Sequence, residues 1–414
     1  MIMKTVVRPE TEMKESGLQW LGEIPNDWKV SRVGNFFSFS SGDSLTNEEI
    51  RDEGMYLVYG ANGIRGYYSK YNLAEKRILL GRVGALAGNV HIVDGKVWVT
   101  EHALIASNKL DLVEEYYGYV FESMNLIQYS KSSAQPVISG DTLQKLRFPV
   151  PKLSEQQAIA DYLDETCSKI DEIIAEAKAS IVEYKELRES VISNATTRGI
   201  KKNRCMKPSG VEWLPEIPSD WNVLSPKVVF AQRKDRAIKG ERQLTASQKH
   251  GIMYQDDYMK EEGVRIVTVE KDFSILKHVE PDDFVISMRS FQGGLEYSYL
   301  RGCISSAYVM LIPNHKYVYS EYYKWFFKSD KYINALQSTS DLIRDGQALR
   351  YANFVKLKLF DIPIEEQKEI ADYLNKEVPK IDSLIAEKES LINDLESYKK
   401  SLIYEVVTGK RRVV

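Results

Sequence analysis

The sequence Glu155-Gln-Gln-Ala-Ile-Ala-Asp-Tyr-Leu163 recurs as Glu366-Gln-Lys-Glu-Ile-Ala-Asp-Tyr-Leu374, and each copy opens a long run of helical pattern. The runs extend from Ser154 to about Thr197 and from Glu365 to about Thr408. Apolar residues recur in both at heptad spacing, which is typical of a helix that packs along another helix. Two matched seams in one chain predict that the helices pair with each other. The predicted seam and partner-contact residues are Leu163, Ile170, Ile174, Ile181, Leu374, Ile381, Ile385 and Ile392.

Two local signals refine this prediction. Pro379 lies inside the second run, at the place that Asp164 to Ser168 occupies in the first, and proline suits the first turn of a helix rather than its interior. We therefore expect each run to be a short helix followed by a long one, the long one about 40 Å in length at 1.5 Å per residue. Ser154 with Gln157 predicts a capping box at the start of the first run.

A second repeat precedes each helical run. Ser16-Gly-Leu-Gln-Trp-Leu-Gly-Glu-Ile-Pro-Asn-Asp-Trp28 recurs as Ser209-Gly-Val-Glu-Trp-Leu-Pro-Glu-Ile-Pro-Ser-Asp-Trp221. The blocks between, Lys29 to Leu153 and Asn222 to Asp361, share little sequence. A constant frame thus surrounds a variable insert twice, which predicts an internal structural repeat. The polar stretch Met1 to Glu15 is expected to form an arm.

Both inserts have the pattern of short strands separated by glycine-rich turns. One helix is predicted in each insert, in the tyrosine-containing stretches 114–129 and 320–336. Strands are predicted at 77–80, 96–100, 264–269, 283–288 and 307–312.

Length and charge limit the possible function classes. A chain of 414 residues is longer than one hydrophobic core ordinarily supports, so we expect about two to three domains. The net charge is −3, but the helical runs are acidic and the stretch from Trp221 to Asp361 is slightly basic, a division compatible with nucleic acid on the globular part and protein on the helices. No long apolar segment or signal-peptide core is present, so we expect a cytoplasmic protein without a membrane partner.

Catalytic and metal-binding patterns are missing from the sequence. There is no Gly-x-x-x-x-Gly-Lys-Ser/Thr loop and no Asn/Asp-Pro-Pro-Tyr/Phe stretch, and the five histidines and three cysteines show no ligand spacing. We therefore expect a chain without an active site and without a cofactor of its own.

Polar residues in glycine-flanked or polar segments of the inserts remain as candidates for DNA contact. Arginine and lysine match the edge of guanine, and asparagine and glutamine match adenine. For any single residue, a solvated loop position or a local ion pair is the simpler interpretation. The candidate DNA-binding set is Ser41, Asn62, Arg65, Tyr67, Arg82 and Gln135 in the first insert and Arg289, Gln292, Arg344, Gln347 and Arg350 in the second.

The duplicated frame at Gly17 to Trp28 and Gly210 to Trp221, with the helix motif at Pro151 to Leu163 and Pro363 to Leu374, resembles the specificity subunit of Type I restriction-modification enzymes. The segment Tyr59-Gly-Ala-Asn-Gly-Ile-Arg-Gly66 also looks like part of a target recognition domain of that family. The resemblance covers nearly the whole chain.

The resemblance implies a non-catalytic subunit in which each insert reads one half of a bipartite, asymmetric target in double-stranded DNA. Two modification (methyltransferase) subunits would dock on the helices, restriction subunits would join them, and S-adenosylmethionine would bind in the methyltransferase partner. The alternative from the residues alone is a coiled-coil scaffold whose inserts bind protein or glycan. A slightly basic balance in the inserts favours DNA.

The predicted fold class is α+β, with two globular target recognition domains separated by two long antiparallel helices. The predicted divisions are residues 1–153 for the arm and first recognition domain, 154–198 for the central spacer helices, 199–364 for the linker and second recognition domain, and 365–414 for the C-terminal spacer helices.

Overall fold

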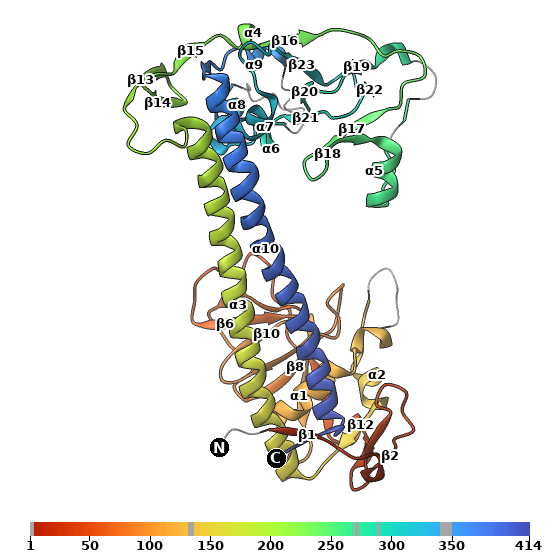
Figure 1. The fold of residues 1–414 in the computed structure, drawn as a ribbon. Coiled ribbons are helices and arrows are strands. Elements are labelled where there is room, and N and C mark those ends of the chain that lie inside the picture. Colours follow the sequence, from red (N-terminus) through yellow and green to blue (C-terminus); the bar gives the residue numbers. More distant parts are fainter. Residues whose placement is uncertain (1–3, 131–135, 267, 270–272, 288–289, 340–349) are drawn as a thin grey trace. The chain divides into compact units, whose positions relative to one another are not determined.

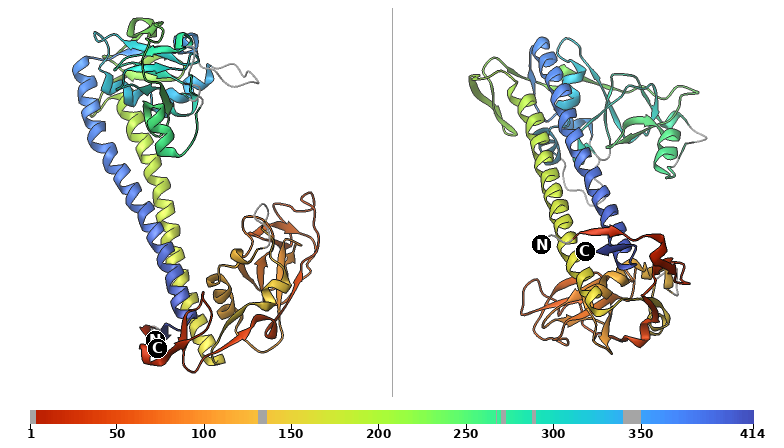
Figure 2. Two further views of the ribbon diagram at one scale, coloured as in Figure 1. Left: turned by 90° about the vertical axis from the view of Figure 1, so that its right-hand side faces the viewer. Right: turned by 60° about the horizontal axis from the view of Figure 1, so that its bottom comes forward.

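The computed structural model describes residues 4–130, 136–266, 268–269, 273–287, 290–339 and 350–414. The chain divides into two compact units. Figure 1 shows the ribbon coloured along the sequence, and Figure 2 shows it from two further directions. Unit 1 comprises Met1–Lys178 and Ser390–Val414, and unit 2 comprises Ala179–Glu389. Among the described residues, no helix is long and apolar enough to cross a membrane.

Two long helices run through the sequence, α3 (Leu153–Arg198) and α10 (Ile364–Val407). In unit 1 they are linked by ion pairs from Lys399 to Asp171, at 2.7 Å, and from Lys178 to Glu396, at 4.0 Å. In unit 2 Arg188 lies 2.7 Å from Asp382. Asp171 precedes Lys178 on α3, whereas their partners on α10 occur in the reverse order, Glu396 before Lys399. The two helices are therefore antiparallel in unit 1, as predicted (Figures 1 and 2).

The heptad positions of these helices are shielded from solvent. Unit 1 buries Leu163, Ile170, Ile174 and Ile392, and unit 2 buries Ile181, Leu374 and Ile381. Ile385 in unit 2 is half-buried.

The predicted break in each helical run is wrong, because α3 and α10 are both continuous. Pro379 lacks an N–H and removes one hydrogen bond from α10, but the helix continues past it. Val378 and Ile381 beside it are buried, so side-chain packing holds the helix together where one backbone bond is missing. The predicted capping box is also wrong. The helix starts at Leu153, Lys152 O accepts the N–H groups of Glu155 and Gln156, and Ser154 falls inside the first turn.

Unit 1 contains a four-stranded sheet of order β5-β11-β8-β9, a three-stranded sheet of order β10-β6-β7, and three two-stranded pairs, β1 with β25, β2 with β3 and β4 with β12. The stretch expected to be an arm forms β1 and β2, and β1 pairs with the last strand of the chain. The strands are β1 (Thr5–Val7), β2 (Met13–Glu15), β3 (Glu23–Pro25), β4 (Lys29–Arg32), β5 (Phe37–Ser41), β6 (Tyr56–Gly60), β7 (Gly63–Tyr68), β8 (Arg77–Gly81), β9 (Val90–Val93), β10 (Trp98–Val99), β11 (Ala103–Asn108), β12 (Arg147–Val150) and β25 (Arg411–Val413). The shorter helices are α1 (Glu114–Ser123), α2 (Gly140–Lys145), and the 3-10 turns Glu10–Glu12, Val33–Asn35 and Leu126–Tyr129.

Unit 2 repeats this scheme with a four-stranded sheet of order β16-β23-β20-β21 and the pairs β13-β14, β15-β24, β17-β18 and β19-β22. Its strands are β13 (Met206–Val211), β14 (Leu214–Pro218), β15 (Asn222–Leu224), β16 (Phe230–Arg233), β17 (Leu244–Ser247), β18 (Gly251–Tyr254), β19 (Lys277–Val279), β20 (Phe284–Ile286), β21 (Glu296–Tyr297), β22 (Gly302–Ile304), β23 (Val309–Pro313) and β24 (Leu359–Asp361). Its helices besides those shared with unit 1 are α4 (Pro226–Val229), α5 (Gln255–Glu262), α6 (Ser290–Gly293), α7 (Ser320–Phe326), α8 (Asp330–Ser338), α9 (Tyr351–Phe354), and the 3-10 turn Phe273–Ile275.

The predicted elements of the inserts are partly confirmed. The strand at 77–80 is β8, and the strands at 96–100, 283–288 and 307–312 correspond to the shorter or shifted β10, β20 and β23. The predicted strand at 264–269 is wrong for its described residues, the first predicted helix ends early, and the second is divided into α7 and α8. The first helix stops at Ser123 because Asn125 adopts a left-handed conformation with φ 48°. With both units mixing helices and short strands, the α+β class is confirmed.

The repeated frame forms the same polar junction in each unit. In unit 1 the buried Trp28 donates its indole Nε1–H to Glu155 Oε2 at 2.9 Å, and Arg8 donates to the other oxygen. In unit 2 the buried Trp221 donates to Glu366 Oε2 at 3.2 Å, and Arg204 donates to both carboxylate oxygens. The frame tryptophan is thereby fastened to the first turn of the long helix. We call this Trp–Glu–Arg set the junction.

The junction in unit 2 gives a direct stability prediction. Glu366→Ala should destabilise unit 2 by about 2–3 kcal/mol, because it removes the buried acceptor of the Trp221 N–H and leaves the Arg204 guanidinium with the exposed Asp220 as its partner. The matched control is Glu365→Ala, one residue earlier on α10, whose side chain is 80% exposed against 3% for Glu366. The control should change the free energy of unfolding by less than about 0.5 kcal/mol. Thermal unfolding followed by tryptophan fluorescence measures both, and equal losses would contradict the assignment.

Candidate nucleic-acid interface

The strand register of unit 1 brings several loops to one end of the domain. Ser41 pairs with Leu104, Ala103 with Gly81, and Leu80 with Val90. The turns at these strand ends therefore lie together at one end of the four-stranded sheet, at the termini of its strands. The β6–β7 hairpin reaches the same end, since the backbone of residue 61 approaches that of residue 81. We call residues 41–43, 61–65, 81–89 and 100–102 the loop end of unit 1.

Arg82 and Ser41 meet at the loop end, as two predicted DNA-contacting residues. Arg82 Nη1 donates to Ser41 Oγ at 2.7 Å. Its backbone is fixed on both sides, because the N–H donates to His102 O at 2.8 Å and the carbonyl accepts from Ile138 N–H at 2.9 Å. The base of this side chain is therefore held, while its guanidinium faces a neutral hydroxyl.

The β6–β7 hairpin presents Asn62 and Arg65, both exposed. Arg65 Nη2 donates to Asn47 Oδ1 at 2.5 Å, and Asn62 Oδ1 accepts from Asn89 Nδ2 at 3.2 Å. His91 supports the hairpin from behind through a hydrogen bond to the backbone of Ala61, and burial lowers the pKa of its imidazole. The hairpin tip thus has a supported backbone and exposes the amide of Asn62 and the guanidinium of Arg65.

Tyr67, which is predicted from the sequence as a DNA contact, lies on β7 and not at the hairpin tip. Its backbone exchanges two hydrogen bonds with Arg51, at 3.0 and 2.8 Å, and its side chain is half-buried. It lies further along β7 than the tip. We therefore regard it as a support for the hairpin.

The two arginines of the loop end differ electrostatically from Arg77, which begins strand β8. Among the described residues, Arg65 and Arg82 have no carboxylate within ion-pair distance, whereas Arg77 is paired with Glu75 and Glu114. The carboxylates at this end instead accept from neutral groups, Asp43 from Asn72 Nδ2 at 2.9 Å and Glu101 from Ser44 Oγ at 3.3 Å. The charge of the two guanidinium groups is thus uncompensated by the protein. Arginine donors in that state can bind a phosphate or a guanine edge.

In unit 2 the predicted residues are less connected. Gln292 is exposed on α6, which follows β20 as the loop 82–89 follows β8. Arg350 is exposed at the start of α9, where its N–H donates to Asn353 Oδ1 at 3.1 Å. Over the described residues, no hydrogen bond or ion pair joins the two. Four further predicted residues, Gln135, Arg289, Arg344 and Gln347, lie outside the residues that the structure describes.

Sequence reasoning missed the loop that follows β16. Arg236 is exposed there and donates Nη1 to Ile275 O at 3.3 Å, a neutral acceptor like those at the loop end of unit 1. The signal was present in the sequence, because residues 233–239 hold four basic side chains and one acidic one. It was overlooked because no glycine flanks the arginine directly.

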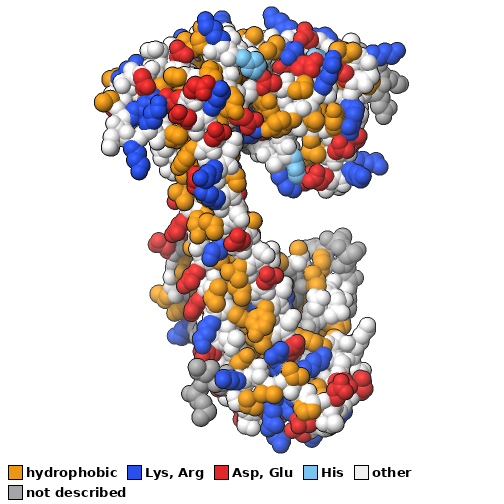
Figure 3. Space-filling model, in the orientation of Figure 1, with side chains coloured by type: hydrophobic (Ala, Val, Ile, Leu, Met, Phe, Trp, Pro, Cys, Tyr) orange, Lys and Arg blue, Asp and Glu red, His pale blue; other side chains and the backbone are white. Residues whose placement is uncertain are grey.

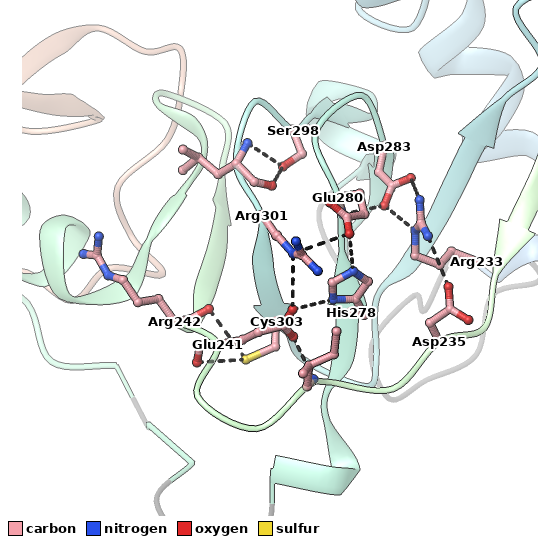
Figure 4. Close-up of polar contacts among 12 residues, drawn as sticks. Arg233, Asp235, Glu241, Arg242, His278, Glu280, Asp283, Ser298, Arg301 and Cys303 are labelled. Carbon is pink, nitrogen blue, oxygen red and sulfur yellow. Dashed lines mark hydrogen bonds and ion pairs between the residues drawn. The ribbon is translucent and has the colours of Figure 1, made fainter.

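A buried ionic cluster lies beside that loop (Figure 4). His278 is only 4% exposed and has a carboxylate at each ring nitrogen, Glu241 at 2.6 Å from Nδ1 and Glu280 at 2.8 Å from Nε2. Arg233 donates to both oxygens of the buried Asp283, at 2.6 and 2.9 Å. Burial raises the pKa of Asp283, and the hydrogen bond from Arg233 opposes that rise.

The cluster fits a structural role. Its side chains are paired with one another, Arg301 also approaches both Glu241 and Glu280, and the pairs join the loop after β16 to strand β19 and the start of β20. No group of histidine, cysteine or carboxylate side chains in the described part of the chain could hold a metal ion.

Comparison with known proteins agrees with this architecture. Residues 25–183 match the family described as Type I restriction modification DNA specificity domain. The chain is 33% identical to the EcoprrI specificity subunit of Escherichia coli over 172 residues, which is 41% of each protein. It is 24% identical to the putative MjaX specificity subunit of Methanocaldococcus jannaschii over 95% of this chain and 96% of that one.

A solved structure shares the fold. It is described in work on complex assembly and conformational transition of the type I R-M system, with a TM-score of 0.67 and 12% identity, covering 94% of this chain and 99% of the other. The family domain, the similarity along nearly the full length and the shared fold all agree. Residues 25–183 thus match the Type I restriction modification DNA specificity domain, and over nearly its full length the chain is similar to Type I restriction enzyme specificity subunits.

Proposed function

We propose that this chain is the DNA-recognition subunit of a Type I restriction-modification complex, and that unit 1 and unit 2 each read one half of a bipartite, asymmetric target. The observation that carries the proposal is the pair of uncompensated arginines, Arg65 and Arg82, at one end of unit 1 beside the exposed amide of Asn62. Guanidinium groups without protein counter-ions attract phosphates, and their paired donors also match guanine. Because the proposed ligand is DNA, we expect the complex to act in the cytoplasm.

The two units would read different sequences because their inserts differ where contact is expected. The β6–β7 hairpin of unit 1 exposes Asn62 and Arg65. The β17–β18 hairpin of unit 2 instead carries Lys249, whose ammonium lies 2.7 Å from Glu262. A neutralised lysine offers less attraction for phosphate than a free arginine. Because the β6–β7 and β17–β18 hairpins differ in charge, we expect the two units to bind DNA half-sites of different sequence.

We further propose that two modification subunits dock on the long helices, one on each unit. In unit 1, Ile173 of α3 and Tyr398 of α10 are 45% and 52% exposed. In unit 2, Leu187 of α3 and Leu384 of α10 are 49% and 40% exposed. Figure 3 shows hydrophobic side chains interspersed with charged ones on the helices.

These exposed pairs obey the internal repeat. Ile173 and Leu384 stand at equivalent positions of the two helical repeats, as do Leu187 and Tyr398. Each unit therefore carries one copy of the same apolar pair, flanking the helix seam. Two equivalent patches suit two identical partners. The adenine methyltransferase activity and its S-adenosylmethionine would belong to those partners, and restriction subunits would complete the complex.

Removing the loop-end arginines tests the DNA contact. In the purified complex with modification subunits, Arg65→Ala and Arg82→Ala should each weaken binding of target DNA by about tenfold, and each should reduce the salt dependence if the lost contact is a phosphate. Arg147→Ala is the matched control, since Arg147 is an exposed arginine of unit 1 on strand β12, outside the loop end. Fluorescence anisotropy at several salt concentrations measures the effects. Equal losses in the control and the test variants would argue against this interface.

Exchange of one insert tests the division of the target. Replacing residues 29–153 by the corresponding insert of another specificity subunit should change one half of the methylated sequence and preserve the other. Strands β4 and β12 close the insert by backbone pairing, so the boundary preserves the frame. Sequencing of methylated adenines in the host genome gives the target directly. A change in both halves would refute modular reading.

Substitution of the apolar pairs tests docking. Ile173→Asp with Tyr398→Asp should reduce the number of bound modification subunits from two to one, and adding Leu187→Asp with Leu384→Asp should abolish assembly, because a charge on a buried contact is strongly unfavourable. Ala179→Asp is the control, because Ala179 is an exposed position of α3 outside both apolar pairs. Light scattering of the purified complexes gives the stoichiometry. Unchanged assembly in all variants would exclude these patches.

A further inference from the structure

The tip of the β6–β7 hairpin contains an exposed aliphatic side chain that the proposed function does not yet use. Ile64 is 59% exposed, between Gly63 and Arg65. In a regular strand, successive side chains point to opposite faces, so Ile64 and Arg65 would point apart. The register shifts here, because Tyr59 pairs with Ile64 while Val58 pairs with Gly66. Arg65 is the extra residue of a β-bulge, and both side chains are exposed.

Glycines make this bulge obligatory. Gly66 has φ 141°, and a Cβ there would lie 2.6 Å from Arg51 O. A Cβ at Gly60 would lie 2.6 Å from Arg65 Cδ. A larger residue at position 66 would displace the backbone of the bulge, whereas one at position 60 would displace the Arg65 side chain. The exposed Ile64 is therefore presented by a fixed backbone, as bulges do when they redirect a side chain.

The surroundings of Ile64 indicate what it meets. Asn62 and Arg65 are exposed on either side of it, and Arg65 is held by a neutral amide oxygen. The positive charge favours a polyanion over a hydrophobic protein surface. The equivalent hairpin of unit 2 lacks this feature, since Ile252, which follows Gly251 as Ile64 follows Gly63, is only 6% exposed.

We propose that Ile64 is a specificity-determining residue that packs against the C5-methyl group of a thymine in the half-site read by unit 1. The inference rests on the proposed DNA-recognition function. In the major groove the thymine methyl is the apolar group that distinguishes this base, and it is read by apolar contact. Asparagine, isoleucine and arginine on one tip would supply complementary partners for adenine, thymine and guanine. A half-site that contains an adenine to be methylated always contains a thymine in the paired strand.

The test couples a change in the protein with a change in the DNA. The complex of the full chain with its modification subunits is titrated with target duplexes in which each thymine of the half-site is replaced singly by uracil, which removes only the methyl group. At one position, uracil should weaken binding by the wild-type complex about three- to fivefold, the factor expected for one buried methyl-sized group. The Ile64→Ala complex should bind thymine and uracil duplexes equally at that position.

Two further variants serve as controls. Ile64→Val keeps a branched side chain and should retain most of the sensitivity to uracil, which shows that the tip remains folded. Leu110→Ala removes another exposed aliphatic side chain, 54% exposed and beyond the other end of β11, and should retain the full sensitivity.

The possible failures are distinguishable. If wild type shows no uracil effect, or if Ile64→Ala keeps it undiminished, Ile64 does not read a thymine methyl. If Ile64→Ala instead loses its modification subunits, the residue belongs to a protein contact and the inference is overturned. If the wild-type complex binds no DNA with sequence preference, the proposed function itself fails.

Discussion

A carboxylate shared between an indole and a guanidinium holds each unit together. Glu366 is buried and accepts from Trp221 and Arg204, and Glu155 accepts from Trp28 and Arg8. A buried carboxylate without partners would cost several kcal/mol, so these contacts must form together. They join the frame and the stretch before it to the first turn of a long helix, which begins more than 100 residues later in the sequence. Everything that the inserts do depends on this fixed base.

The residue after each junction carboxylate extends the same base to the insert. Gln156 accepts from Val113 N–H and donates to Pro151 O, and Gln367 accepts from Tyr319 N–H and donates to Ile362 O and Tyr317 O. The glutamine thereby fixes the start of the helix that follows the main sheet of each insert. An amide can do this because it donates and accepts at once. Attachment through backbone groups leaves the insert side chains free to differ, which is why two unlike inserts fit one frame.

The repeats and heptads were sufficient to predict the two long helices and their antiparallel pairing, because hydrophobic periodicity survives in any packed helix. The reason for the repeated Glu-Gln pair was not predicted. Its partners lie in residues such as Arg8 and Val113, and no spacing in the sequence connects them. Pro379 misled the helix prediction for a related reason, since tertiary packing at Val378 outweighs a single lost backbone bond.

The candidate interface, too, could be predicted from the sequence only in part. Ser41, Asn62, Arg65 and Arg82 were predicted from their residue types and glycine neighbours, and the structure brings them to one end of unit 1. The electrostatic distinction between an arginine held by a neutral oxygen and one held by a carboxylate could not be predicted from sequence. For Arg236 in unit 2 that distinction is what identifies the residue.

The pairing of β1 with β25 has a consequence for the order of folding. Unit 2 is one continuous stretch of chain, whereas unit 1 needs both ends of the polypeptide, with Val6 opposite Arg412 and Tyr116 hydroxyl bonded to Val407 O. During synthesis the second unit therefore has all its residues before the first does, although the ribosome makes the first one earlier. Unit 1 therefore keeps an unfinished edge until residues 411–413 emerge, and pairing of β1 with β25 closes a loop that contains the whole of unit 2.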